Sequence, residues 1–157
     1  RKRYDLAREV VARLDKSLDA ELVVAWQVPH SLIPVYMNAC NALLFVSMYE
    51  GSPNVVKEAL ACNLPVVSVP VGDVQERLNG VAGCRVCSDE APDEIAKALA
   101  EVLRTNTRTE GRSTVRQLGE EILAKRMIQI YRSAIDRVGA RGRSGSQPTA
   151  LSTWSGR

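Results

Sequence analysis

Short, almost wholly apolar runs alternate along this chain with segments in which apolar residues recur at helical spacing. The runs cover residues 21–26, 42–47 and 64–69, and a weaker one surrounds Val86. A strand that is apolar on both faces must be covered on both faces, which is typical of a parallel sheet with right-handed crossover helices. We therefore predict an α/β chain built on a Rossmann-like, doubly wound parallel sheet.

The segments between and after these runs predict the helices that would cover such a sheet. A proline near the start of one of them, Pro34, is acceptable in a first helical turn, and Gly119 is where we expect a break in the last. The expected helices cover residues 4–19, a stretch from about 32, residues 53–61, a short stretch after 72, and residues 92–103 and 114–138.

A chain of 157 residues that is 45% hydrophobic can bury one sizeable core. We expect one domain over residues 1–138, and a disordered tail over residues 139–157, where Gly, Ser and Arg leave little to bury. A doubly wound unit normally begins with a strand whose loop meets ligand phosphates, yet Arg1 already stands at a predicted helix start. We therefore expect the first strand to be missing and the natural domain to extend upstream.

Charge and hydropathy exclude several function classes. The net charge is only +3, and the basic residues are spread along the helices rather than gathered with aromatics, so a nucleic-acid partner is not favoured. No apolar run approaches the roughly 20 residues that cross a bilayer, and no signal-peptide pattern opens the chain. We expect a cytoplasmic protein.

Four cysteines raise the question of a metal site. Cys84 and Cys87 have the spacing of a metal-binding pair, but the sequence offers no second pair and a single histidine, His30. Cys40 and Cys62 lie in predicted helices or strand ends. We therefore predict four free, mostly buried thiols and no bound metal.

The turn that follows the second apolar run is suited to an anion. Ligands of open parallel sheets lie beyond the carboxyl ends of the strands. Gly51 and Ser52 would let a phosphate approach the backbone, and Pro53 fits a helix start. The unpaired amides of Asn54 and Val55, together with the helix dipole, would supply positive potential.

Charged residues near this turn have two interpretations. Glu50 and Glu58, eight positions apart, bracket it, but glutamates at such positions are as often solvated or capping carboxylates. Lys2 could reach the same phosphates, although a lysine at a helix start more often faces solvent. His30 could line the pocket or could be a loop residue bonded to backbone.

Over residues 2–131 the chain resembles the C-terminal, donor-binding half of retaining GT-B glycosyltransferases of group 1, also called family 4. The resemblance is carried by YEGSP at residues 49–53, EALACNLPVV at 58–67 and VGDVQE at 71–76. KRYD at 2–5 and VPH at 28–30 agree with it in order and spacing.

The resemblance implies a transferase whose donor is a nucleotide-diphosphate sugar, with no metal or other cofactor. Lys2 would neutralise the diphosphate, and the backbone amides from Gly51 to Val55 would hold it. The reaction breaks the bond between the anomeric carbon and a phosphate oxygen, so the leaving diphosphate must be stabilised. Lys2 is therefore expected to be catalytic.

The resemblance also implies roles for the two glutamates. Glu50 would contact hydroxyls of the donor sugar as the second catalytic residue, and Glu58 would hold the ribose hydroxyls. Val28 and His30 would form the wall beside the base. A second domain that binds the acceptor would be the partner, so this chain alone would bind donor without useful transfer. Contact of the full-length protein with the inner membrane face stays open.

Four positions depart from the family pattern. Val46 replaces a usual proline and Asn41 a common aspartate, while Asn63 takes a glycine position where a left-handed cap is expected, for which asparagine is the best substitute. Asp73 stands where a second glycine is frequent. This last change places a carboxylate close to the donor.

Two other functions fit the same architecture. A sugar-nucleotide epimerase would use the same diphosphate cradle, with its acid and base groups in the opposite half. A non-catalytic nucleotide-binding module would lack that half. The sequence names neither the base, the sugar nor the acceptor.

Overall fold

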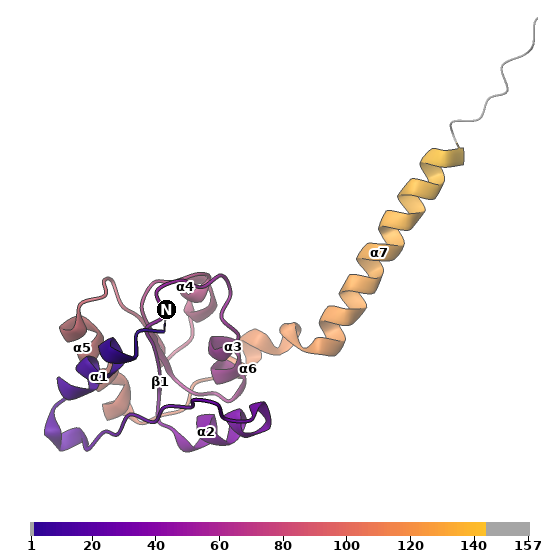
Figure 1. The fold of residues 1–157 in the computed structure, drawn as a ribbon. Helices are drawn as coiled ribbons and strands as arrows, with labels where there is room; N and C mark the ends of the chain where they lie inside the picture. The colour runs from indigo at the N-terminus through magenta and orange to yellow at the C-terminus, as the bar shows by residue number, and fades with distance from the viewer. Residues whose placement is uncertain (1, 144–157) are drawn as a thin grey trace, which may run out of the picture. The chain divides into compact units, whose positions relative to one another are not determined.

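The computed structural model describes residues 2–143 (Figure 1). The chain forms two compact units, Arg1–Arg116 and Gln117–Arg157. The first unit holds the sheet and the predicted site residues. The predicted boundary of the domain at residue 138 stays a prediction.

Three parallel strands form the sheet of the first unit. They are β1 (Leu43–Phe45), β2 (Val66–Ser68) and β3 (Arg85–Val86), in the order β1-β2-β3. Leu44 pairs with Val67, and Val67 pairs in turn with Arg85. β2 is buried along its whole length because it lies between the other two strands and is covered on both faces. The predicted α/β fold with a Rossmann-like parallel sheet is confirmed.

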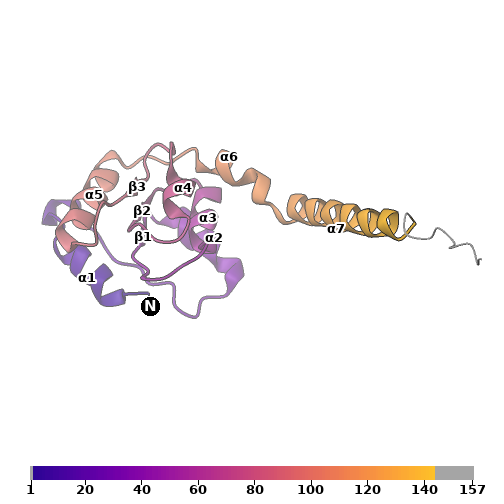
Figure 2. The ribbon, with the colours of Figure 1, turned by 90° about the horizontal axis from the view of Figure 1, so that it is seen from above.

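Helices cover both faces of this sheet, as Figures 1 and 2 show. On one face lie α1 (Tyr4–Ala12) and α5 (Pro92–Thr105), which pack against each other. On the other face lie α2 (Ile33–Ala39), α3 (Asn54–Ala61) and α4 (Val74–Leu78), with α3 contacting both β1 and β2. The core between these layers contains the fully buried side chains of Val56, Leu60, Val66, Val67 and Ile95.

The strand predicted over residues 21–26 is absent from the described structure. Its apolar side chains are exposed, with Val23 and Val24 at about half and Trp26 at 76% of their full surface. Asp19 and Gln27, which flank the run, have positive φ angles that break extended geometry. Within the described residues β1 pairs with β2 alone, so the run does not pair with the other edge of β1, and apolar composition by itself does not make a strand.

The first helix is shorter than the predicted 4–19. α1 ends at Ala12, and a 3₁₀ turn, η1 (Lys16–Leu18), follows. Asp15 explains the break, because its side chain accepts a hydrogen bond from the Ser17 amide at 2.9 Å and so starts a new turn. A second 3₁₀ turn, η2 (His30–Leu32), leads into α2, which has Pro34 in its first turn as predicted.

The last predicted helix is divided. It begins earlier than predicted, at α6 (Gly111–Val115), and continues through a 3₁₀ turn, η3 (Arg116–Leu118), before the expected break at Gly119. In the second unit, α7 (Glu120–Arg143) runs five residues beyond the predicted end at 138. The first residues of the predicted tail are therefore helical, and residues 144–157 lie outside the described residues.

The four cysteines are free thiols. Cys84 and Cys87 are buried, and Cys40 and Cys62 are half-buried. Burial raises the pKa of Cys84, and burial together with the charges of Glu94 and Asp89 raises the pKa of Cys87 to about 11. Among the described residues no group of His, Cys, Asp and Glu side chains is arranged to hold a metal ion.

Alkylation by iodoacetamide at pH 8 should distinguish the two pairs of thiols. Because the thiolate is the reactive form, Cys87 should react about two orders of magnitude more slowly than an ordinary exposed thiol. We expect Cys40 and Cys62 to be modified first, and Cys84 and Cys87 only after unfolding in urea. A C40S/C62S double variant serves as the control; rapid modification of it in the native state would contradict this burial.

Candidate active site

The predicted anion-binding turn lies at the carboxyl edge of the sheet. β1 ends at Phe45, and the chain passes through buried Val46 and Ser47 before it turns into α3. The loop after β2 reaches the same turn, because the Asp73 amide donates to the Gly51 carbonyl at 2.9 Å. The turn therefore sits where open parallel sheets bind their ligands.

The amino end of α3 is open to an anion. The helix starts at Asn54, and Pro53 before it is extended and supplies no side-chain cap. The Asn54 side chain instead accepts a hydrogen bond from the Lys57 Nζ atom at 3.1 Å. The first amides of the helix, including those of Asn54 and Val55, therefore lack helical acceptors and carry the positive end of its dipole.

Lys2 and Glu50, the two predicted catalytic residues, are brought together across 48 positions of sequence. The Lys2 Nζ atom lies 2.6 Å from Glu50 Oε1 and 5.7 Å from the centre of the Phe45 ring. Lys2 is largely exposed, so this ion pair is weak and the ammonium group can reorient. Both residues flank the turn at Gly51 and Ser52.

Arg3 is a residue of this edge that the sequence pattern did not single out. Its guanidinium donates to the Val46 carbonyl at 2.5 Å and the Ser47 carbonyl at 3.3 Å, and it forms an ion pair with Glu90. Arg3 therefore ties the chain after β1 to the loop after β3. Its position beside Lys2 at a helix start was the available signal, but nothing in the sequence indicated the carbonyl oxygens that it meets.

His30 and Glu58 also come together, although 28 positions separate them. The His30 Nε2 atom lies 3.1 Å from Glu58 Oε1. His30 is 86% exposed and Glu58 about one third exposed, so both remain accessible to a ligand. Val28, two positions before His30 in the sequence, is half-buried. His30 of the predicted wall and the predicted ribose-binding glutamate thus share one surface.

Asp73 joins the loop after β2 to the anion-binding turn. Its Oδ2 atom accepts hydrogen bonds from the Ser52 hydroxyl at 2.6 Å and from Arg77 Nε at 2.8 Å. Burial acts to raise the pKa of Asp73, but the hydrogen bonds from Ser52 and Arg77 outweigh it, so the pKa lies below the ordinary value. This contact is therefore lost only when the pH falls through that lowered pKa.

A sequence model of the family described as Glycosyl transferases group 1 matches residues 3–105, which is more than half of the chain. The chain belongs to this family. The matched span includes every predicted site residue except Lys2, which stands one position before it. Comparison with curated proteins and with solved structures gives no match. In the described part of this group 1 glycosyl transferase, no helix is both long and apolar enough to cross a membrane.

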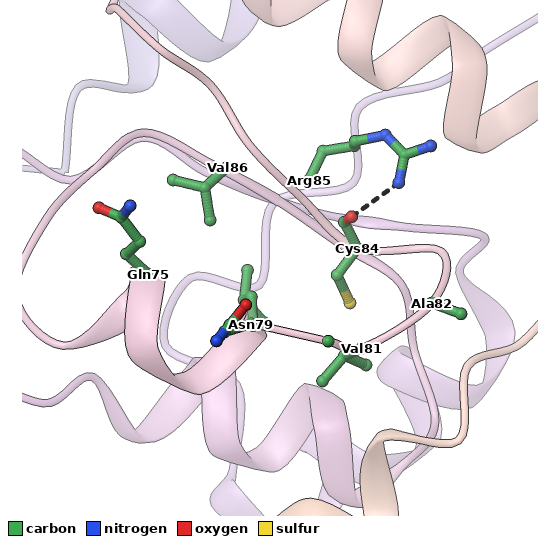
Figure 3. A pocket seen from close by; sticks show the side chains of 9 residues that line it. Gln75, Asn79, Val81, Ala82, Cys84, Arg85 and Val86 are labelled. Atoms are coloured by element: carbon green, nitrogen blue, oxygen red, sulfur yellow. Dashed lines mark hydrogen bonds between the residues drawn. The ribbon is translucent and has the colours of Figure 1, made fainter.

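A separate surface pocket of about 460 Å³ lies beside α4 and β3 (Figure 3). Gln75, Asn79, Cys84 and Arg85 are among the residues that line it, and Arg85 donates to the Cys84 carbonyl at 2.9 Å. None of the predicted site residues lines this pocket. In this glycosyl transferase the pocket beside β3 is therefore distinct from the sheet edge where the predicted site residues lie.

Gly72 permits the close approach of the two loops. Its φ angle is +56°, and a Cβ atom there would lie 2.4 Å from the Gly51 carbonyl oxygen. Both the left-handed backbone and the missing side chain are therefore required at this position.

Substitution of Gly72 should accordingly cost more than loss of backbone freedom alone. Gly80 is a matched control, because its φ is +74° but a Cβ atom there would meet nothing within 4 Å. We expect G80A to destabilise the fold by about 1 kcal/mol, and G72A by at least about 1 kcal/mol more, as measured by urea unfolding. Equal losses for the two variants would contradict the tight contact with Gly51.

Proposed function

We propose that this chain binds the nucleotide-diphosphate sugar donor of a retaining, metal-independent glycosyltransferase, which passes the glycosyl group to an acceptor. The observation that carries this proposal is the convergence on one sheet edge of a helix start without a side-chain cap from Pro53, the exposed Lys2 ammonium group, and the carboxylates of Glu50 and Glu58. Membership of the group 1 family supports glycosyl transfer in general. The identity of the donor rests on the chemistry of this edge.

The diphosphate would lie at the start of α3. The amides of Asn54 and Val55, with those of Gly51 and Ser52, are the donors on offer, and Lys2 can turn from Glu50 toward a phosphate. Negative charge develops on the leaving diphosphate as the anomeric bond breaks. Preorganised donors aimed at such charge contribute about 2.7–4 kcal/mol each to transition-state stabilisation.

The two glutamates would recognise hydroxyl groups. A carboxylate only accepts hydrogen bonds, which suits the vicinal hydroxyls of ribose at Glu58 and of a hexose at Glu50. His30, held against Glu58 at 3.1 Å, and Val28 would border the base. The approach of Lys2 to Glu50 would place the sugar next to its departing diphosphate.

The acceptor would be bound by a second domain on the amino-terminal side of this one. Reaction in a cleft between two domains requires both, so the chain alone would bind donor and transfer hexose too slowly to be useful. The full-length enzyme would act in the cytoplasm on polysaccharide or glycolipid precursors, with peripheral contact at the inner membrane face.

Donor binding can be measured by ligand-observed NMR with UDP-, GDP- and ADP-sugars. We expect one nucleotide class to bind saturably and E58A to weaken it about 10- to 100-fold, because a charged acceptor of ribose hydroxyls is lost. E101A is the control, since Glu101 is a half-exposed residue of α5 whose partner is Arg85 at 3.7 Å.

Two results would count against this function. Absence of binding by the folded protein would remove the donor-domain proposal for this chain. If E58A and E101A weaken binding equally, the nucleotide occupies a surface other than the one at Glu58, whichever base it carries.

A further inference from the structure

The anion-binding turn is held from two sides by groups far away in sequence. Lys2 meets it at Glu50, and the loop after β2 meets it at Gly51 and Ser52 through Asp73. The second contact is double, because the Asp73 backbone amide and side-chain carboxylate each engage a different residue of the turn.

The backbone contact fixes how one peptide of the turn points. In a planar trans peptide the carbonyl and the following N–H point in opposite directions. The Gly51 carbonyl accepts from the Asp73 amide at 2.9 Å, so the Ser52 N–H is directed away from the loop after β2. That leaves the Ser52 N–H available to the same ligand as the first amides of α3.

The side-chain contact fixes the rest of the turn. The Ser52 hydroxyl donates to Asp73 Oδ2 at 2.6 Å, across 21 positions of sequence. Arg77 donates to the same oxygen at 2.8 Å from the next turn of α4. A negative charge beside an anion site is unfavourable in itself, and the Arg77 guanidinium compensates it.

The other carboxylate oxygen of Asp73, Oδ1, lacks a hydrogen-bond donor in the described part of the chain, so the position of this side chain does not use all of its hydrogen-bonding capacity. Oδ1 is buried and accepts no hydrogen bond within the described residues. A buried acceptor left unsatisfied costs about 1–3 kcal/mol. The carboxylate is thus held where it serves Ser52 rather than where all its own lone pairs are used.

We propose that Asp73 is a positioning residue that keeps the turn of Gly51 and Ser52 in its diphosphate-binding shape, with Arg77 as its counter-charge. This inference deepens the proposed function and rests on it. Asp73 itself touches no reacting atom. It acts through Ser52 and through the orientation of the Gly51 carbonyl.

The shape of the turn can be tested without any ligand. Hydrogen exchange of the residue 73 amide reports its bond to the Gly51 carbonyl, after correction for intrinsic rates. We expect D73A to speed this exchange at least 10-fold, while D73N, whose amide oxygen can still accept from Ser52 and Arg77, stays within about threefold of the parent protein. E76A, at an exposed neighbouring position of α4, is the control.

Binding of UDP, GDP, ADP and inorganic pyrophosphate to the same variants tests the consequence. For the probe that binds best, D73A should weaken binding at least 10-fold, and D73N should bind as well as the parent or better because a negative charge is gone. S52A should weaken binding too, and S52A/D73A should be no worse than the poorer single variant. Thermal melting of each variant separates this effect from loss of fold.

The outcomes separate the positioning role from the proposed function. If the parent protein binds no probe, the proposed function fails, while the exchange measurement still decides whether Asp73 holds the turn. If the parent binds and D73A binds equally well, or if D73N loses as much as D73A, the positioning role is overturned and the proposed function stands. Unchanged exchange in D73A would overturn it as well.

Discussion

The burial of β2 on both faces is the constraint on which the rest of the structure depends. Because β2 lies between β1 and β3 and is wholly buried, helices must cover both faces, and each connection must return to start the next parallel strand. All three strands then end at one edge. The turn after β1, the loop after β2 and the loop after β3 meet there, although no local sequence signal connects them.

Charge at this edge is paired residue by residue. Lys2 faces Glu50, Arg3 faces Glu90 and Arg77 faces Asp73 as ion pairs, and the His30 ring meets Glu58 at hydrogen-bond distance. The exposed contacts of Lys2 and His30 contribute little free energy, so a ligand could replace the partner of either side chain. The more buried pairs, at Arg3 and Arg77, hold the loops themselves. The start of α3 remains at the centre with its positive potential, because Pro53 supplies no side-chain cap and the first turn of the helix holds no acidic residue.

The elements that the sequence predicted correctly are those whose own residues determine them. The strands at β1 and β2 and the proline-started α5 follow from local pattern, and the left-handed Asn63, with φ +54°, agrees with the cap that the family resemblance implied. The run over residues 21–26 was wrong as a strand, because it does not pair with the outer edge of β1 and apolar composition alone does not determine pairing. Arg3 was missed for the same kind of reason, because the carbonyl oxygens to which it donates lie more than 40 positions away in the sequence. The predicted site residues converge in the structure, but their roles remain proposals.

The most direct test of a diphosphate site at the start of α3 is to map amide chemical-shift changes in ¹⁵N-labelled protein on titration with a nucleoside diphosphate. We expect saturable shifts centred on Ser52, Asn54 and Val55, with smaller ones at Glu58. Shifts centred instead on Asn79 to Val86, around the pocket of about 460 Å³, with the start of α3 unmoved, would contradict a diphosphate site there.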